Sequence, residues 1–134
     1  MTTRRLPYAQ APFLNGPVGD ASISLGAETT NTVTATVTVK DANGKAVSQR
    51  TALDWYLSTL ATGEDVVGTA PNAGVVTGSA GAVHQQVTGK SGVVITNASG
   101  VANLVIGDSG AYTCYLVIRL PDGTLKVSDL VTLV

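Results

Sequence analysis

The fold of this chain is decided by its last 27 residues, Asp108 to Val134, which read DSGAYTCYLVIRLPDGTLKVSDLVTLV. The segment from Ala111 to Leu120 is rich in β-branched and aromatic residues, which favour strands. Pro121-Asp122-Gly123 supplies a turn, and a second strand-forming run follows it from Leu125 to Val134. We therefore predict that two antiparallel strands joined by a tight turn end the chain.

The start of this stretch, Asp108 to Cys114, has the spacing D-x-G-x-Y-x-C. This is the spacing of a tyrosine corner, in which a Tyr at the edge of a sandwich bonds its hydroxyl back to the backbone. Tyr112 occupies the Tyr position of the pattern. The pattern predicts an immunoglobulin-like β-sandwich, and this fold class favours binding or assembly over catalysis.

Turn residues divide the preceding sequence into further short strands. Thr32 to Lys40 alternates strictly between apolar and polar residues, and Ala52 to Ser58 places Trp55 on its apolar face, where sandwiches of this kind keep a core Trp. No amphipathic helical period occurs, so we predict an all-β fold of about seven or eight strands. The other strands are expected at residues 22–25, 82–88, 92–96 and 101–106, with loops and a weak edge strand in 62–81.

The expected core surrounds Trp55, Tyr112 and Cys114, which we predict to be buried together. Cys114 is the only cysteine, so no intrachain disulfide can form and the core must depend on apolar packing. We interpret Cys114 as a small buried hydrophobe, with a reactive thiol as the alternative. The residues expected around these three are Val37, Val39, Leu53, Leu57, Leu104, Ile106, Leu116 and Ile118.

Residues 1–20 are predicted to form an extended N-terminal arm, and residues 21–134 a single sandwich domain. The arm contains Pro7, Pro12 and Pro17, which prevent a continuous helix or central strand. Its apolar side chains would gain by leaving water, so we expect them to lie on their own domain or on a neighbour; a disordered terminus is the alternative. The candidate interface residues are Leu6, Tyr8, Phe13 and Leu14.

The composition argues against several classes of partner. Charged residues make up 13% of the chain, eight basic and nine acidic, and the only basic cluster is Arg4-Arg5. A nucleic-acid partner is not expected, because binding it needs several cationic side chains on one face. Nor is a membrane, since no apolar run approaches the roughly 18 residues of a spanning segment. The prolines near the N-terminus also make a poor secretory signal, so we expect synthesis in a cytoplasm.

One short motif resembles the surroundings of a protease nucleophile. Gly107 to Gly110 reads GDSG, as around the serine of chymotrypsin-like proteases, but the only available base is His84, 25 residues before Ser109. The one carboxylate between His84 and Ser109 is Asp108, inside the motif itself, so a triad lacks its acid. We interpret the motif as a turn, and His84 as solvent-facing or at a subunit contact.

Two further motifs also read as turns. Gly89-Lys90-Ser91 lacks the first glycine and the helix of a phosphate-binding loop, and Asp41 to Gly44 (DANG) lacks the closing acid of a calcium loop. A single His and a single Cys cannot supply a zinc site. We therefore predict no metal, no cofactor and no enzymatic activity.

Four segments resemble small structural proteins of tailed bacteriophages. Val37 to Val47 (VTVKDANGKAV) is similar to the strand and turn of bacterial Ig-like domains. Together with Leu53 to Thr59 (LDWYLST), Ile95 to Ala102 (ITNASGVA) and the final TLKVSDLVTLV, it resembles head decoration and head-fibre proteins. The likeness covers roughly residues 30–134.

This resemblance implies a non-enzymatic structural virion protein that decorates a capsid. Such a cement protein binds the major capsid protein on the outer surface of a phage head and stabilises the shell through subunit contacts. It implies a homo-oligomer, most simply a trimer, made in the host cytoplasm and located on the capsid surface. The alternatives are a phage tail or head-fibre component, or an Ig-like adhesion or binding module. A start at Met1 without a signal, a single domain and an apolar arm favour the virion protein.

Overall fold

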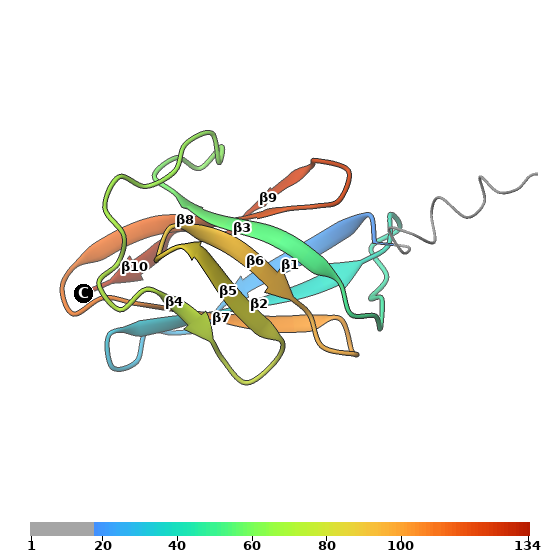
Figure 1. Ribbon diagram of the computed structural model, residues 1–134, viewed down its shortest axis with the longest axis horizontal. Coiled ribbons are helices and arrows are strands. Elements are labelled where there is room, and N and C mark those ends of the chain that lie inside the picture. The colour runs from blue at the N-terminus through green and yellow to red at the C-terminus, as the bar shows by residue number, and fades with distance from the viewer. Residues whose placement is uncertain (1–17) are drawn as a thin grey trace, which may run out of the picture.

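The computed structural model describes residues 18–134, which form a β-sandwich of two antiparallel sheets (Figure 1). The all-β sandwich predicted from the sequence is therefore confirmed. The described residues contain ten strands, more than the seven or eight expected: β1 (Asp20–Leu25), β2 (Thr32–Lys40), β3 (Ala52–Ser58), β4 (Val75–Thr77), β5 (Ala82–Val87), β6 (Ser91–Ile95), β7 (Val101–Gly107), β8 (Tyr112–Arg119), β9 (Leu125–Val127) and β10 (Val131–Leu133).

The strands occupy positions that correspond to those of an immunoglobulin variable-type sandwich, but they are connected differently. One sheet has the order β1-β2-β7-β4, and the other has β10-β8-β3-β6-β5 with β9 also paired to β8. These match the ABED sheet and the GFCC′C″ sheet of that fold. The connectivity differs at three positions. In chain order β4, β5 and β6 lie at the D, C″ and C′ positions, whereas an immunoglobulin variable domain passes through them as C′, C″ and D.

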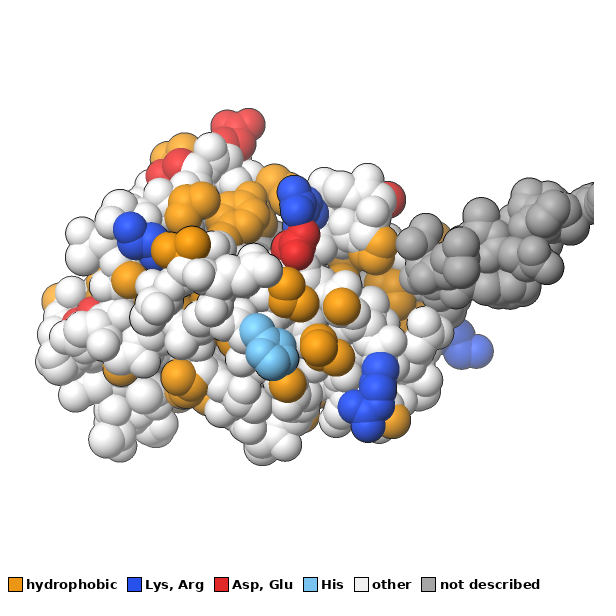
Figure 2. All heavy atoms as spheres, viewed as in Figure 1, with side chains coloured by type: hydrophobic (Ala, Val, Ile, Leu, Met, Phe, Trp, Pro, Cys, Tyr) orange, Lys and Arg blue, Asp and Glu red, His pale blue; other side chains and the backbone are white. Residues whose placement is uncertain are grey.

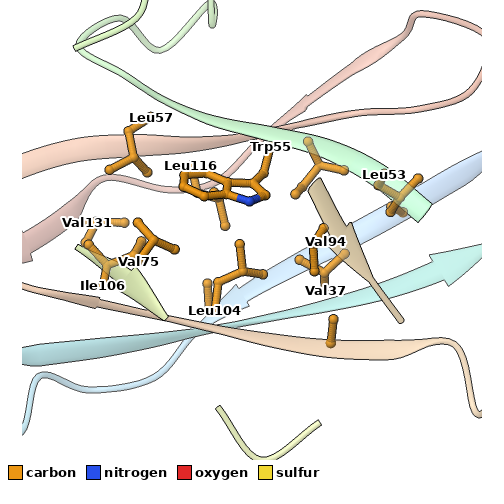
Figure 3. Packing of buried hydrophobic residues seen from close by; sticks show 14 of the residues in the cluster. Val37, Leu53, Trp55, Leu57, Val75, Val94, Leu104, Ile106, Leu116 and Val131 are labelled. Carbon is orange, nitrogen blue, oxygen red and sulfur yellow. The ribbon is translucent and has the colours of Figure 1, made fainter. Parts of the chain in front are cut away.

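The core lies between the two sheets and is made by the alternation that the sequence shows. In β2 every second residue is buried, beginning with Val33, and the Thr residues between them point outward. Trp55 on β3 is 1% exposed and lies among apolar side chains from both sheets (Figure 3). The labelled neighbours in that view are Val37, Leu53, Leu57, Val75, Val94, Leu104, Ile106, Leu116 and Val131.

The last predicted strand is divided in two, which corrects the expectation of one continuous run from Leu125 to Val134. β9 pairs with Val117–Arg119 of β8, whereas β10 pairs with Tyr112–Cys114. Between them Ser128 turns its side chain to the backbone, and its Oγ accepts a hydrogen bond from the Leu116 amide at 2.9 Å. A side-chain oxygen thus takes the place of a ladder carbonyl, and this interrupts the strand.

The first described residues belong to the sandwich although the sequence placed them in the arm. Val18 is 9% exposed, the Gly19 amide donates to the Lys40 carbonyl at 2.9 Å, and β1 begins at Asp20. The sandwich therefore includes the chain from Val18 onward. The predicted interface residues Leu6, Tyr8, Phe13 and Leu14 lie outside the described residues.

Candidate interaction surface

The structure places two of the three predicted core residues deep inside and the third at the rim. Trp55 and Cys114 are each 1% exposed, whereas Tyr112 is partly buried and packs against the core from its edge. The expectation that Tyr112 is buried together with Trp55 and Cys114 is therefore wrong. Its hydroxyl must reach a polar partner, which keeps the side chain at the edge of the core. Burial raises the pKa of the Cys114 thiol to about 12, so the thiol stays protonated and unreactive at neutral pH.

Tyr112 ties a long loop to the sandwich. Its hydroxyl donates to the Thr69 carbonyl at 2.6 Å, and burial raises the pKa of this phenol to about 12. The bond to a backbone carbonyl was expected for a tyrosine corner, but the partner is 43 positions earlier in the chain, in the loop between β3 and β4. The residue thus fixes a distant loop instead of its own turn.

We expect Tyr112→Phe to destabilise the protein by about 0.5 to 1.5 kcal/mol, because it removes one hydrogen bond and leaves the Thr69 carbonyl without that donor. The change should be measured as a shift of the urea midpoint. Tyr115→Phe is the control, since Tyr115 lies on the same strand and is also partly buried. Equal midpoints for Tyr112→Phe and the wild type would contradict the role assigned to the hydroxyl.

The side chains of the protease-like motif hold the same loop. The Asp108 carboxylate accepts hydrogen bonds from the amides of Asn72 and Gly110, both at 2.8 Å. The Ser109 hydroxyl accepts from Asn72 Nδ2 at 2.7 Å, and the Ser109 amide donates to Asn72 Oδ1 at 3.0 Å. His84 lies on β5 and makes none of these contacts. Asp108 and Ser109 are therefore occupied in a structural turn.

A second acid anchors the beginning of this loop. The Asp65 carboxylate accepts hydrogen bonds from the hydroxyls of Ser58 and Thr59 and from the Thr59 amide. These donors hold the pKa of Asp65 below its usual range. Nearby, the Tyr56 hydroxyl donates to the Gly63 carbonyl, so the loop folds back over the outer side of β3.

This anchor should weaken in acid. Because the folded pKa of Asp65 lies below the unfolded value of about 3.9, its stabilisation is present above that value and is lost as the pH falls through the folded pKa. We expect the Thr59 amide to be protected from hydrogen exchange at neutral pH and to lose that protection, relative to its intrinsic exchange rate, in acid. In Asp65→Asn the neutral-pH exchange should already be fast, and an unchanged Thr59 amide would contradict the assignment.

On the outer face of the six-stranded sheet, several apolar residues lie in neighbouring positions. In register across β3, β6 and β5, Ala52 lies beside Ile95 and Ala82, and in the next row Asp54 lies beside Val93. We call Ala52, Ala82, Val93 and Ile95 the β6 face. Figure 2 shows hydrophobic side chains gathered on the side of the molecule that carries the histidine. The outer face of the other sheet carries the Thr side chains of β2, with Val105 and the 46% exposed Val76 in the same row as Thr34.

A shallow hollow of about 400 Å³ adjoins the β6 face. Its floor is Ala52 and Asp54 at the start of β3, and its wall is the β8–β9 turn from Leu120 to Gly123. The Asp54 carboxylate pairs with the guanidinium of Arg119, whose Nε donates to it at 3.1 Å. Hydrogen bonds to Thr124 lower the pKa of Asp122, so this carboxylate stays charged beside the hollow.

The β6 face was not foreseen from the sequence, although a signal for it exists. Val93, Val94 and Ile95 are consecutive apolar residues, and only Val94 points into the core. A strand that is apolar on both sides is typical of one covered on both faces. His84 of β5 lies beside Val93 at the border of the β6 face, and it is exposed as expected.

Within residues 18–134, no group of three or more His, Cys, Asp or Glu side chains is arranged to hold a metal ion. The same part of the chain contains no helix long and apolar enough to cross a membrane. Comparisons with protein-family models, with curated proteins and with solved structures found no match.

Proposed function

We propose that this protein is a structural component of a bacteriophage virion, a capsid decoration protein that binds the outer surface of the head and stabilises it by adding contacts between subunits. The observation that carries the proposal is the apolar β6 face on a small domain with few charges. Apolar side chains in neighbouring positions on an outer sheet face suit a contact with another protein. The sequence segments that resemble phage head proteins favour a capsid as the partner in this contact.

The use of the polar side chains supports an assembly role over catalysis. Asp65, Asp108, Ser109 and Tyr112 are all engaged in hydrogen bonds that hold the loop between β3 and β4. A loop fixed in this way keeps one shape, which suits a permanent contact because less conformational entropy is lost on binding. The buried, protonated Cys114 offers no nucleophile.

Under the proposal, a gene that neighbours the gene of this chain encodes a major capsid protein, and the test uses capsids built from that protein. Purified full-length protein is added to empty capsids, which are then sedimented. We expect binding that saturates at a fixed ratio to the capsid protein and raises the temperature at which the capsids disassemble. Binding to isolated tails or fibres instead would select a tail or head-fibre component, and binding to no virion part would contradict the proposal.

The N-terminal segment is expected to act in assembly and not in folding. Because Val18 and Gly19 belong to the sandwich, the deletion that tests this removes residues 2–17. We expect an unchanged melting temperature and a loss of oligomer mass and of capsid binding. Burial of four apolar side chains at roughly 1.5 to 3 kcal/mol each, before ordering costs, is enough to decide whether a subunit stays attached. Full assembly of the shortened chain would place the interface on the sandwich itself, on the β6 face or on the Thr-rich sheet face.

A further inference from the structure

Strand β6 has apolar residues on both of its sides, and the described residues bury the inward side fully and the outward side in part. Val94 points inward and is fully buried, while Val93 and Ile95 point outward and are partly exposed. Strand β2 instead has Thr residues at its outward positions, although Val105 of β7 lies beside Thr34 in the sheet. The outer side of β6 therefore leaves apolar side chains partly exposed, and another apolar segment could cover them.

The first 17 residues have the composition that such a partner needs. They contain Arg4 and Arg5 and no acidic residue, so the remaining 117 residues carry six of the eight basic side chains and all nine acidic ones. The segment and the sandwich are therefore opposite in net charge. The segment also supplies apolar side chains for the β6 face, namely Leu6, Tyr8, Phe13 and Leu14.

The hollow extends the β6 face in a way that suits an extended, proline-containing segment. Ala52 belongs to both surfaces, so the apolar strip runs without a break into the hollow. Asp54 is neutralised by Arg119, which removes an unpaired charge from the floor. Asp122 at the wall keeps a negative charge that can attract Arg4 or Arg5.

We propose that residues 1–17 of one copy of this chain lie across the β6 face of a second copy. This inference rests on the proposed function, in which copies of the protein contact one another. Seventeen extended residues reach about 56 Å, several times the radius of gyration of about 13 Å that a domain of about this size has. The segment can therefore leave its own sandwich and cross the next one.

Binding to a second copy lets the segment reach a β6 face without wrapping around its own sandwich. The segment joins the sandwich at β1, the edge strand of the four-stranded sheet, whereas the β6 face is the outer side of the six-stranded sheet. If each copy gives its segment to the next, every copy both donates and accepts. Contacts of this head-to-tail kind close into a ring when the rotation between copies closes, and form an open filament when it does not.

The first test compares full-length variants by sedimentation velocity over a series of concentrations. Val93→Lys places a charge on the β6 face, and Thr34→Lys makes the same change at an outward position of β2. A third variant replaces Leu6, Tyr8, Phe13 and Leu14 with Ser and leaves the sandwich untouched. We expect the wild type and Thr34→Lys to associate, and the other two variants to stay monomeric with native-like circular dichroism.

The decisive test mixes the two monomeric variants. Val93→Lys keeps a working segment but has a blocked face, and the Ser variant keeps a working face but has no apolar segment. We expect them to form a 1:1 heterodimer, because one segment can still bind one face. A variant that has merely failed to fold cannot restore its partner in this way.

Three results would overturn the inference. The first is a wild type that is monomeric at every concentration, together with a loss of hydrogen-exchange protection at the β6 amides when the Ser variant is compared with the wild type. The segment would then cover the β6 face of its own sandwich. The second is a Ser variant that still associates, so that the faces pair without the segment. The third is a mixture that stays monomeric. Because no capsid is present, these results leave the capsid-binding test of the proposed function separate.

Discussion

Trp55→Ala should lower the free energy of unfolding by about 3 to 5 kcal/mol, the usual cost of removing a large buried aromatic side chain. Trp55 is 1% exposed and lies between the sheets, and its Nε1 donates to the His84 carbonyl at 3.3 Å. No disulfide compensates for the cavity, because Cys114 is the only cysteine of the chain. A loss of this size is a large part of the 5 to 15 kcal/mol that stabilises a typical domain.

The measurement is urea denaturation followed by far-ultraviolet circular dichroism, since the substitution removes the only tryptophan and with it the fluorescence signal. Trp55→Phe is the matched control. It keeps an aromatic ring in the core and removes the bond to His84, so its cost should be clearly smaller than that of Trp55→Ala. An alanine variant that unfolds at the wild-type midpoint would show that this Trp does not support the core.

The inward faces of the strands could be predicted from the sequence because local alternation determines them. Thr32 to Lys40 and Ala52 to Ser58 were predicted with the bounds that β2 and β3 have. In both, every second residue is apolar, and this period alone decides which side is buried. The expected weak edge strand is present as β4, only three residues long.

Features set by distant contacts could not be predicted in the same way. The partner of Tyr112 is Thr69, and no local pattern links a tyrosine to a loop 43 residues away. The division of the last strand depends on Ser128, whose hydroxyl replaces a backbone acceptor only because Leu116 lies opposite. The reversed path through β4, β5 and β6 likewise follows from pairing between strands, which composition and period do not specify.

The candidate surface is an intermediate case. The three consecutive apolar residues from Val93 to Ile95 are visible in the sequence, but which of them faces outward depends on the pairing of β6 with β3 and β5. That pairing also brings Ala52 and Ala82 to the same side. The sequence therefore shows that β6 has apolar residues on both sides, and the register shows which of them form one continuous face.

The second large effect is expected at Gly92, where β5 approaches β6 most closely. A Cβ at this position would overlap the carbonyl oxygen of His84, which is backbone and cannot turn aside as a side chain could. The same carbonyl accepts the hydrogen bond from Trp55, and the pairing of β5 with β6 shifts register between Gln85 and Val87. Glycine thus lets the His84 carbonyl turn toward the indole.

We expect Gly92→Ala to cost about 3 kcal/mol, at the upper end of what overpacking usually costs, because β5 must move away and the Trp55 bond is lost with it. Gly68→Ala is the matched control, since a Cβ there meets nothing within 4 Å, and it should change the stability by less than about 0.5 kcal/mol. Urea denaturation of both variants gives the difference directly. In the alanine variant the Trp55 emission of the folded protein should also shift, because the indole loses its polar partner. If Gly92→Ala and Gly68→Ala have the same urea midpoint, β5 can pair with β6 without the close approach of the His84 carbonyl to residue 92.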